Sequence, residues 1–216
     1  MNPRLSFDLE RGGGGPVAGA DEAGRGCLAG PLVAAAVSFD YRSFRAHDLV
    51  ALEALDDSKK LSRTARAGVY AAVVARAARL AVVSCSPASI DGRGLHRCNL
   101  FALDRALALL GPVGGPAFVD GFPLRQCAVE HVALVGGDGR SAAVAAASIV
   151  AKVTRDRLMV ALHAHYPAYG FDTHVGYSCP DHRQAILDHG VSALHRLSFA
   201  SVAYQQLDLG LGRPTT

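Results

Sequence analysis

The sequence predicts an α/β domain in which a central mixed β-sheet is flanked by helices, with a further helical unit at the C-terminal end. Half of the 216 residues are apolar and 19% are charged, which is enough to bury a large core. Short apolar runs fill much of the first 135 residues, and longer alanine-rich segments lie between and after them. Strands that alternate with helices, with helices last, are typical of a layered α/β domain.

Five runs have the length and apolar content of strands, and each is bounded by glycine, proline or polar residues. They are VAGADEA (17–23), LVAAAVSF (32–39), LAVVSCS (80–86), AFVDG (117–121) and AVEHVALV (128–135). The first and fourth carry acidic residues at their far ends. These acids are the first candidates for chemistry.

Three longer segments predict helices. They are an alanine-rich stretch that begins near Ser62, GLHRCNLFALDRALALLG (94–111) and SAAVAAASIVAKVTRDRLMVALHAHY (141–166). Ser141 is a suitable N-cap for the last of these, because its hydroxyl can accept a backbone hydrogen bond in the first turn. After the loop YPAYGFDTHVGY, two short helical stretches predict the C-terminal unit.

We expect one domain with two flexible ends. Residues 1–15 end in RGGGG and read as a flexible lead-in. Residues 16–166 form the main α/β unit, residues 167–207 the C-terminal helical unit of the same domain, and residues 208–216 a flexible tail.

Bulk properties narrow the class of protein. A net charge of +3 is compatible with nucleic acid but does not establish it. The five cysteines are odd in number and lack a C-x-x-C pair, so they read as reduced thiols, not as disulfides or a zinc site. No secretory signal pattern and no apolar run near the roughly 18 residues of a membrane span is present. We therefore expect a soluble, cytoplasmic protein without a membrane partner.

Four acids, each with glycine close by, carry the chemical prediction: Asp21, Glu22, Asp120 and Asp138. Carboxylates gathered at one edge of a sheet repel one another unless a divalent cation neutralises them, and such oxygen ligands favour Mg²⁺ or Mn²⁺. Taken singly, each aspartate is more often a turn residue or a helix cap. Spacing alone therefore indicates only a candidate metal site.

The segment GRGCLA (24–29) also fits the dinucleotide-binding pattern G-x-G-x-x-A. That pattern should open a helix after a strand, whereas Pro31 and a β-prone run follow here. Two acids directly ahead of the glycines would also repel a pyrophosphate. The nucleotide-cofactor interpretation is accordingly disfavoured.

Six ordered segments resemble the type 2 ribonuclease H family, in its bacterial ribonuclease HII form. They are AGADEAGRGCLAGPLVAAAV, DDSKKLS, FVDG, GGDGRSAAVAAASIVAKVTRDRLM, YPAYGFDTHVGY and HRLSFASV, and together they span roughly residues 17–202. The resemblance implies a ribonuclease H-like fold. It also implies cleavage of RNA in RNA–DNA hybrids and incision 5′ of single ribonucleotides embedded in duplex DNA, leaving 3′-hydroxyl and 5′-phosphate ends. This activity would serve ribonucleotide removal during DNA replication and repair.

The resemblance further implies that Asp21, Glu22, Asp120 and Asp138 are catalytic and hold two Mg²⁺ or Mn²⁺ ions. Gly24, Arg25 and Gly26 would touch the ribose 2′-hydroxyl, largely through their backbone groups, because this hydroxyl distinguishes RNA from DNA. Tyr177 would stack on the deoxyribose that follows the ribonucleotide, with Tyr169 as the rival. The expected contacts to the phosphate backbone are Ser58, Lys59, Lys60, Ser148 and Lys152. His174 receives no firm role.

Five residues depart from the usual pattern of the family: Cys27, Phe122, Gly136, Val175 and Leu197. None of them removes a carboxylate or a glycine of the predicted site. Two alternatives remain open. One is a catalytically silent nucleic-acid-binding module on this fold, and the other is a different metal-dependent nuclease or recombinase, for which the glycine segment would have no purpose. We expect a monomer whose partner is nucleic acid.

Overall fold

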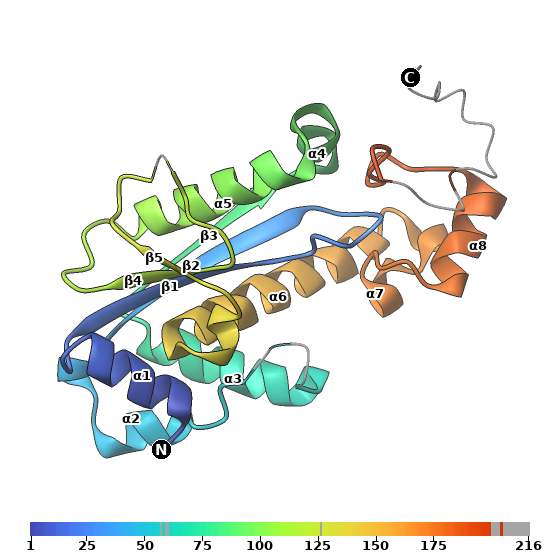
Figure 1. Ribbon diagram of the computed structural model, residues 1–216. Helices are drawn as coiled ribbons and strands as arrows, with labels where there is room; N and C mark the ends of the chain where they lie inside the picture. The colour runs from blue at the N-terminus through green and yellow to red at the C-terminus, as the bar shows by residue number, and fades with distance from the viewer. Residues whose placement is uncertain (57, 59–60, 126, 200–203, 205–216) are drawn as a thin grey trace.

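The computed structural model describes residues 1–56, 58, 61–125, 127–199 and 204. A sheet with strand order β3-β2-β1-β4-β5 forms its centre (Figure 1). The strands are β1 (Pro16–Ala23), β2 (Leu32–Asp40), β3 (Arg79–Cys85), β4 (Ala117–Asp120) and β5 (Val132–Leu134). β2 pairs antiparallel with β1 and β3, whereas β4 pairs parallel with β1 and β5. The predicted mixed sheet is confirmed, although β5 is shorter than its apolar run.

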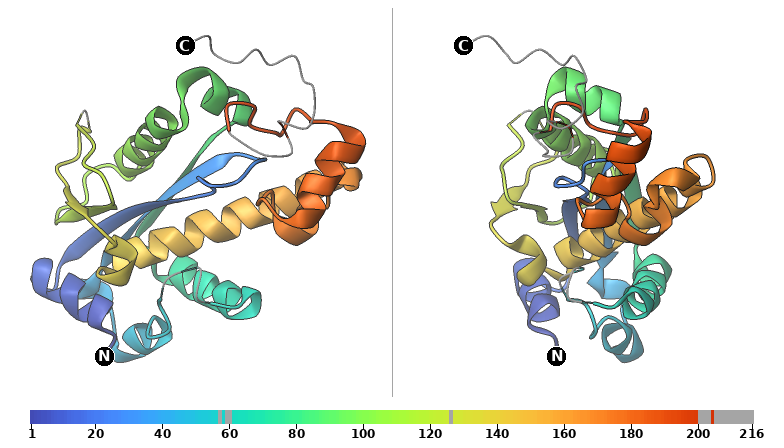
Figure 2. Two further views of the ribbon diagram at one scale, coloured as in Figure 1. Left: turned by 45° about the vertical axis from the view of Figure 1, so that its right-hand side comes forward. Right: turned by 90° about the vertical axis from the view of Figure 1, so that its right-hand side faces the viewer.

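Helices cover both faces of the sheet (Figure 2). On one face lie α4 (Pro87–Arg93) and α5 (Leu95–Leu109), and on the other lie α1 (Pro3–Arg11), α3 (Arg63–Arg76) and α6 (Ala142–His163). The strands are therefore apolar on both sides: alternate β1 residues pack toward α6 and toward α5 in two separate cores. A short helix, α2 (Ala46–Ala51), was not anticipated from the sequence.

The longest helix, α6, lies directly against the strand that carries the first two acids. Its alanine-rich N-terminal half is fully buried, and Ser141 caps it by accepting a hydrogen bond from the Val144 N–H at 3.3 Å. A Cβ atom at Gly19 of β1 would collide with the α6 backbone at Ala143 and Val144. Glycine at this position thus allows the helix and the strand to approach closely.

The prediction of a flexible lead-in over residues 1–15 is wrong for residues 3–11, which form helix α1. Asn2 caps this helix, Pro3 occupies its first turn, and the fully buried Leu5 packs into the core beneath α6. The glycine run that suggested flexibility begins only after the helix ends. The glycine-rich composition of residues 12–15 therefore does not describe residues 3–11, which have helical periodicity.

Asp8 of α1 is a fully buried carboxylate at the N-terminus of α6. Its Oδ2 accepts hydrogen bonds from the Ala143 N–H at 2.8 Å and from the Tyr41 hydroxyl at 3.0 Å. Burial nevertheless raises the pKa of Asp8 to about 6, because the lost hydration outweighs these hydrogen bonds. The carboxylate anchors α1 and occupies the positive end of α6.

This pKa shift predicts a pH-dependent effect of replacing Asp8 with Asn. Since the folded-state pKa exceeds the unfolded one, the native protein loses stability as the pH rises from about 4 through about 6, by about 2–3 kcal/mol at most. The D8N protein lacks this loss. The unfolding free energy of D8N minus that of the wild type should therefore increase as the pH rises from 4 to 7. Urea unfolding at several pH values measures the difference. The half-buried Asp40, whose pKa is lowered by its hydrogen bonds with Arg42, is the control: its effect on stability falls below about pH 4, so the difference between D40N and the wild type should stay nearly constant from pH 4 to pH 7.

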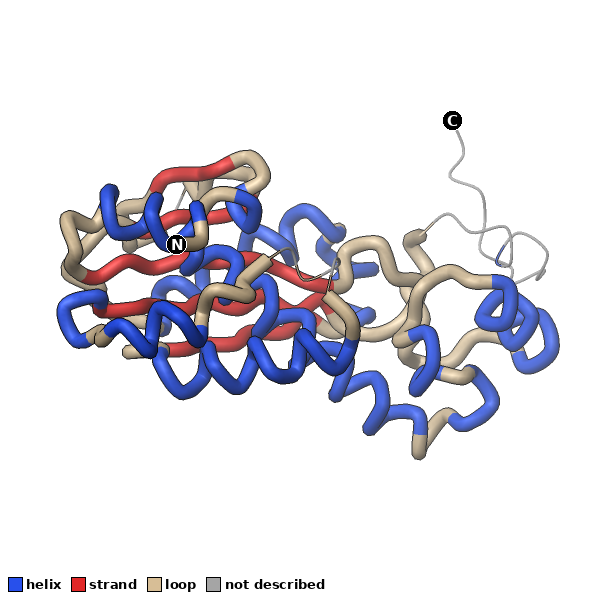
Figure 3. Tube along the Cα trace, turned by 90° about the horizontal axis from the view of Figure 1, so that it is seen from below, coloured by secondary structure: helices blue, strands red, loops and turns tan. Residues whose placement is uncertain are grey.

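The C-terminal unit lies beyond the end of the sheet, next to the C-terminal part of α6 (Figures 1 and 3). Its helices are η3 (Pro167–Tyr169), α7 (Phe171–His174) and α8 (Pro180–His189), and a small core of its own packs against Ala29 and Met159. These helices lie within residues 167–207, and the bounds predicted for the helical unit stay a prediction. The predicted tail over residues 208–216 lies outside the described residues.

Two further expectations concern the cysteines and membrane-spanning helices. All five cysteines are free, as predicted. Among the helices of the described part, none combines the length and the apolar character that crossing a membrane requires.

Candidate active site

The acids of β1 and β4 meet at one edge of the sheet. β1 and β4 run parallel with Ala20 opposite Val119, so the next residues, Asp21 and Asp120, occupy neighbouring positions. Side chains alternate between the faces of a strand, which directs Asp21 and Asp120 toward α6 and Glu22 toward α5. Two adjacent strand ends therefore bring three of the four predicted acids together.

Each β1 acid has a polar partner from the helix that it faces. Ser148 of α6 hydrogen-bonds to Asp21, and Asn99 of α5 hydrogen-bonds to Glu22. Asp21 is buried, at 6% exposure, and its Oδ1 also accepts a hydrogen bond from the Glu22 N–H at 2.7 Å. Asn99, which is 1% exposed, was missed by sequence analysis because it lies within an ordinary amphipathic helix.

Asp138 is brought to the same edge by a single turn, η2 (Gly137–Gly139), just before α6. The Gly137 N–H donates to Asp120 Oδ1 at 2.6 Å. From α1, Arg4 Nε donates to the Asp138 carbonyl oxygen at 2.7 Å, and the same guanidinium pairs with Asp56. The N-terminal helix thus fixes the loop that carries the fourth acid, a role that no sequence pattern revealed.

The electrostatics of the acids favour a cation. Burial raises the pKa of Asp21 well above its ordinary value, and the charges of Glu22 and Asp120 add to this effect. Burial also raises the pKa of Glu22, although Arg25, 3.3 Å away, partly offsets the shift. A divalent cation would relieve the repulsion, and an all-carboxylate donor set suits a hard ion.

Within the described residues, no three His, Cys, Asp or Glu side chains are already arranged as a ready set of metal ligands. Asp21 and Asp120 each direct one oxygen to a backbone N–H, at Glu22 and Gly137 respectively. A carboxylate oxygen can accept more than one contact, so these hydrogen bonds do not exclude metal ligation by the same side chains. The chemistry of the donors therefore fits a divalent metal.

The glycine segment follows the acids on a turn that is buried at Gly24 and exposed beyond it. Gly24 has φ +89°, and a Cβ there would collide with the buried side chain of Arg155. Arg25 and Gly26 are exposed. Arg196 Nη1 donates to the Arg25 carbonyl at 3.0 Å and thereby holds the backbone of this turn. The segment presents main-chain groups at the surface beside Glu22.

Tyr177 lies close to this turn and is 39% exposed. Its hydroxyl hydrogen-bonds with the thiol of Cys27, and Lys152 Nζ lies 5.0 Å from the centre of its ring. Tyr169, the rival, is only 8% exposed, donates to the Gly190 carbonyl at 3.2 Å and stacks on Phe171. The structure thus gives Tyr177 an accessible ring and Tyr169 a place in the core.

The other predicted substrate contacts are distributed differently. Ser58 and Ser148 are buried and hydrogen-bonded to each other at 3.1 Å, so they lie beneath Asp21, and a contact with phosphate stays a prediction for both. Lys152 pairs with Asp156 at 2.8 Å. Lys59 and Lys60 lie outside the described residues. Arg66, which sequence analysis overlooked, donates to the Ser58 and Leu61 carbonyls, both at 2.7 Å.

His174 uses both ring nitrogens within its own loop. Its Nε2 hydrogen-bonds with the Tyr169 carbonyl at 2.7 Å, and its Nδ1 accepts from the Gly176 N–H at 3.2 Å. Burial lowers the pKa of His174. These contacts favour a structural role over proton transfer.

The structure places four of the five departures from the family pattern as follows. Val175 is 6% exposed in the core of the C-terminal unit. Gly136 has φ +64° before η2. Cys27 contacts Tyr177, as described above, and Leu197 is 39% exposed, with its N–H donating to Asp91 at 2.9 Å.

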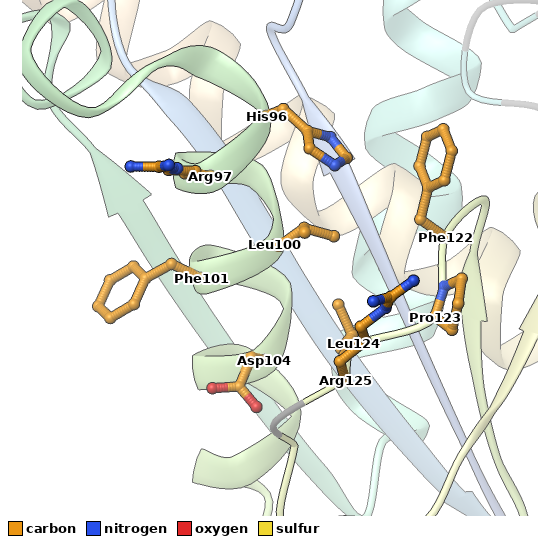
Figure 4. Close-up of a pocket in the computed structure, with 9 residues that line it drawn as sticks. All are labelled: His96, Arg97, Leu100, Phe101, Asp104, Phe122, Pro123, Leu124 and Arg125. Carbon is orange, nitrogen blue, oxygen red and sulfur yellow. The ribbon is translucent and has the colours of Figure 1, made fainter.

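A groove beside Asp120 contains Phe122, the remaining departure. The hollow measures about 500 Å³ and is lined by residues of α5 and of the loop after β4 (Figure 4). Phe122 is 50% exposed, and its N–H donates to the Asp120 carbonyl at 3.2 Å. None of the four acids lines the groove, so it adjoins the acidic site without containing it.

The mixed sheet, the acids gathered at its edge and the exposed glycine turn define a ribonuclease H-like nuclease. The family model described as Ribonuclease HII matches residues 18–202. The chain is 48% identical over 211 residues to the ribonuclease HII of Azorhizobium caulinodans, covering 95% of this chain and 78% of that protein.

Solved structures agree with this classification. The ribonuclease H2 of Pyrococcus horikoshii OT3 superimposes with a TM-score of 0.73 at 26% identity, covering 88% of this chain and 96% of that one. A Bst ribonuclease HIII in complex with Mn²⁺ shares the fold, with a TM-score of 0.70 at 19% identity over 95% of this chain and 73% of that one. The chain belongs to the ribonuclease HII family. It is a type 2 ribonuclease H, a hydrolase that acts as an endoribonuclease on RNA–DNA hybrids.

Proposed function

We propose that this ribonuclease depends on Mg²⁺ or Mn²⁺ and incises 5′ of single ribonucleotides embedded in duplex DNA as well as cutting continuous hybrids. The products are a 3′-hydroxyl and a 5′-phosphate, and the activity serves ribonucleotide removal during DNA replication and repair. One observation carries the proposal: after Ala23, the acids Asp21 and Glu22 are followed by a glycine turn in which Gly24 is buried against Arg155 and Arg25 and Gly26 are exposed. We also propose that the enzyme is monomeric and cytoplasmic.

Asp21, Glu22, Asp120 and Asp138 are the residues that would hold two divalent ions. When bound, such ions supply a water of lowered pKa and neutralise charge on the departing 3′ oxygen. Around them, Ser148 and Asn99 orient the two β1 carboxylates. Burial of Asp21 keeps bulk water from this carboxylate, which strengthens its interaction with a cation.

Recognition of a junction uses two neighbouring surfaces. The backbone at Gly24 to Gly26 receives the ribose 2′-hydroxyl, which only the RNA residue offers. The ring of Tyr177 packs on the following deoxyribose. Lys152, beside that ring, adds positive charge for the phosphate backbone, and Lys59 and Lys60 are proposed to do the same.

The test is a labelled DNA duplex that carries one ribonucleotide, incubated with Mg²⁺, Mn²⁺ or a chelator. A continuous RNA–DNA hybrid and an all-DNA duplex are run beside it. We expect a metal-dependent nick 5′ of the ribonucleotide and an intact all-DNA control. Cleavage of the all-DNA duplex would indicate a different nuclease, and folded protein that cuts nothing would indicate a silent binding module.

Replacing Tyr177 with Ala should lower kcat/KM for the single-ribonucleotide duplex more than for the hybrid, because a hybrid offers no deoxyribose after each cut. A factor of about 10–100 is expected when a base-stacking or sugar-stacking ring worth about 1–3 kcal/mol is lost. The Y177F protein keeps the ring and should keep the preference, although it loses the hydroxyl that contacts Cys27. Equal losses on both substrates would contradict the junction role.

A further inference from the structure

The loop that carries Tyr177 has an unfavourable backbone conformation. Val175 has φ 45° and Gly176 has φ 85°. Left-handed backbone is costly for a β-branched residue, and such strain persists only where surrounding contacts enforce it. Arg155 enforces it on one side, because its Nη1 donates to the Val175 carbonyl at 2.9 Å.

His182 of α8 provides the contact on the other side. Its Nδ1 lies 2.8 Å from the Tyr177 carbonyl oxygen. A carbonyl can only accept, so this nitrogen carries the hydrogen. His182 Nε2 is then the bare nitrogen of a neutral ring, and it must accept a hydrogen bond to be satisfied.

His195 supplies that hydrogen bond. The Ser192 N–H donates to His195 Nδ1 at 2.8 Å, which leaves the ring hydrogen on Nε2. His195 Nε2 lies 3.2 Å from His182 Nε2, so His195 donates and His182 accepts. The partners therefore assign one tautomer to each ring, and the hydrogen bonds run in one direction from Ser192 to Tyr177.

The two rings are neutral and tightly packed. His182 is fully buried and His195 is 3% exposed, and burial lowers the pKa of each to about 4. The ring of His174 stacks on His182 with centroids 4.4 Å apart and an angle of 17° between planes. Phe171 packs edge-on against His182 at 5.6 Å. Hydrogen bonds at both ring nitrogens and packing against the ring thus fix the orientation of His182.

We infer that His182, with His195 behind it, positions Tyr177 and so determines the preference of the enzyme for a ribonucleotide–deoxyribonucleotide junction. The inference rests on the role proposed above for Tyr177. His182 acts through the backbone of the loop and not by contact with the reacting atoms, so both histidines are positioning residues. They explain why a solvent-exposed ring is held in one place although its loop is strained.

The test uses variants that keep or remove one donor each. H182N places an amide N–H where Nδ1 was, whereas H182L removes the donor. H195Q likewise keeps an N–H near the Nε2 position, and H195L removes it. We expect H182L and H195L to lower kcat/KM for the single-ribonucleotide duplex by about 10-fold to 100-fold, the scale of a substrate-contacting group displaced by about 1 Å. Cleavage of the continuous hybrid should fall much less, and H182N and H195Q should recover most of the loss.

The Y177A protein distinguishes a failure of the role proposed for Tyr177 from a failure of the inference about His182. If Y177A leaves the ratio of the two substrates unchanged, the role proposed for Tyr177 is wrong. If Y177A changes the ratio but folded H182L retains the wild-type ratio, the inference about His182 is overturned. Leucine in place of the exposed His165, just before the C-terminal unit, is the control for a histidine change and should leave the ratio unaltered.

A second measurement decides the matter if the leucine variants do not fold. In wild-type protein with ¹⁵N-labelled histidine, nitrogen chemical shifts report the tautomer of each ring. We expect the hydrogen on Nδ1 of His182 and on Nε2 of His195 at neutral pH. The opposite tautomer at His182, or a charged ring there, would remove the hydrogen-bond chain and the inference with it.

Discussion

Replacing Asp21 with Asn should lower kcat on RNA–DNA hybrids by more than about 100-fold, since even residues that only orient metal ligands are worth about 10–100-fold. The fold should persist, because Asn can still accept the hydrogen bond from the Glu22 N–H. The thermal midpoint without added metal should stay level or rise. The raised pKa of Asp21 shows that its charged form is disfavoured in the fold, and Asn carries no charge.

Single-turnover cleavage and a thermal melt of the same preparation measure both effects. Asn in place of the exposed Asp188, which hydrogen-bonds only to Gln184 on its own helix, is the matched control and should leave both quantities unchanged. Substantial turnover by D21N would remove Asp21 from the metal site. A large drop in the thermal midpoint would show instead that the carboxylate is needed for folding.

The second large effect is expected on stability, from replacing Arg155 with Lys. The guanidinium is fully buried and donates to three carbonyls, those of Ala29, Pro31 and Val175, each at 2.9 Å. A single ammonium cannot reach all three in this fork geometry. Buried acceptors left without partners cost about 1–3 kcal/mol each, so R155K should lose about 3–5 kcal/mol of unfolding free energy.

Urea unfolding measures this loss, and activity should fall with it because both the Gly24 turn and the Tyr177 loop pack on Arg155. Arg157, two residues further along α6, is exposed and lies over Tyr70, so R157K is the control and should change stability little. If R155K loses less than about 1 kcal/mol, the carbonyls have other partners and Arg155 does not join the two segments.

The strands, the main helices and the edge of the sheet that carries the acids could be predicted because each depends on local sequence. β1 carries Asp21 and Glu22 just before its last residue, β4 ends in Asp120, and parallel pairing then brings the strand ends together. The N-cap at Ser141 is confirmed for the same reason. Position in a strand and periodicity in a helix are properties of a few neighbouring residues.

The supporting contacts could not be predicted, because they join residues that are far apart in the sequence. Arg4 donates to the carbonyl of Asp138, and Asp8 accepts from the backbone of Ala143. Arg155 looks like any solvated arginine in the sequence VTRDRL, yet its helix places it in the interior. Local pattern does not distinguish a buried arginine from an exposed one when its partners are backbone carbonyls.

The link between Arg25 and Arg196 has a consequence for protein synthesis. All four acids and the whole sheet have left the ribosome before residue 196 is added, so most of the domain can begin to fold first. The turn at Gly24 to Gly26 then still lacks the hydrogen bond from Arg196, and Gly30 still lacks its own. A nascent chain that stops before Arg196 would therefore carry the acids but not the hydrogen bond that fixes the turn after them. The acids and the turn that follows them are thus fixed at different stages of synthesis, the turn only after Arg196 has been added.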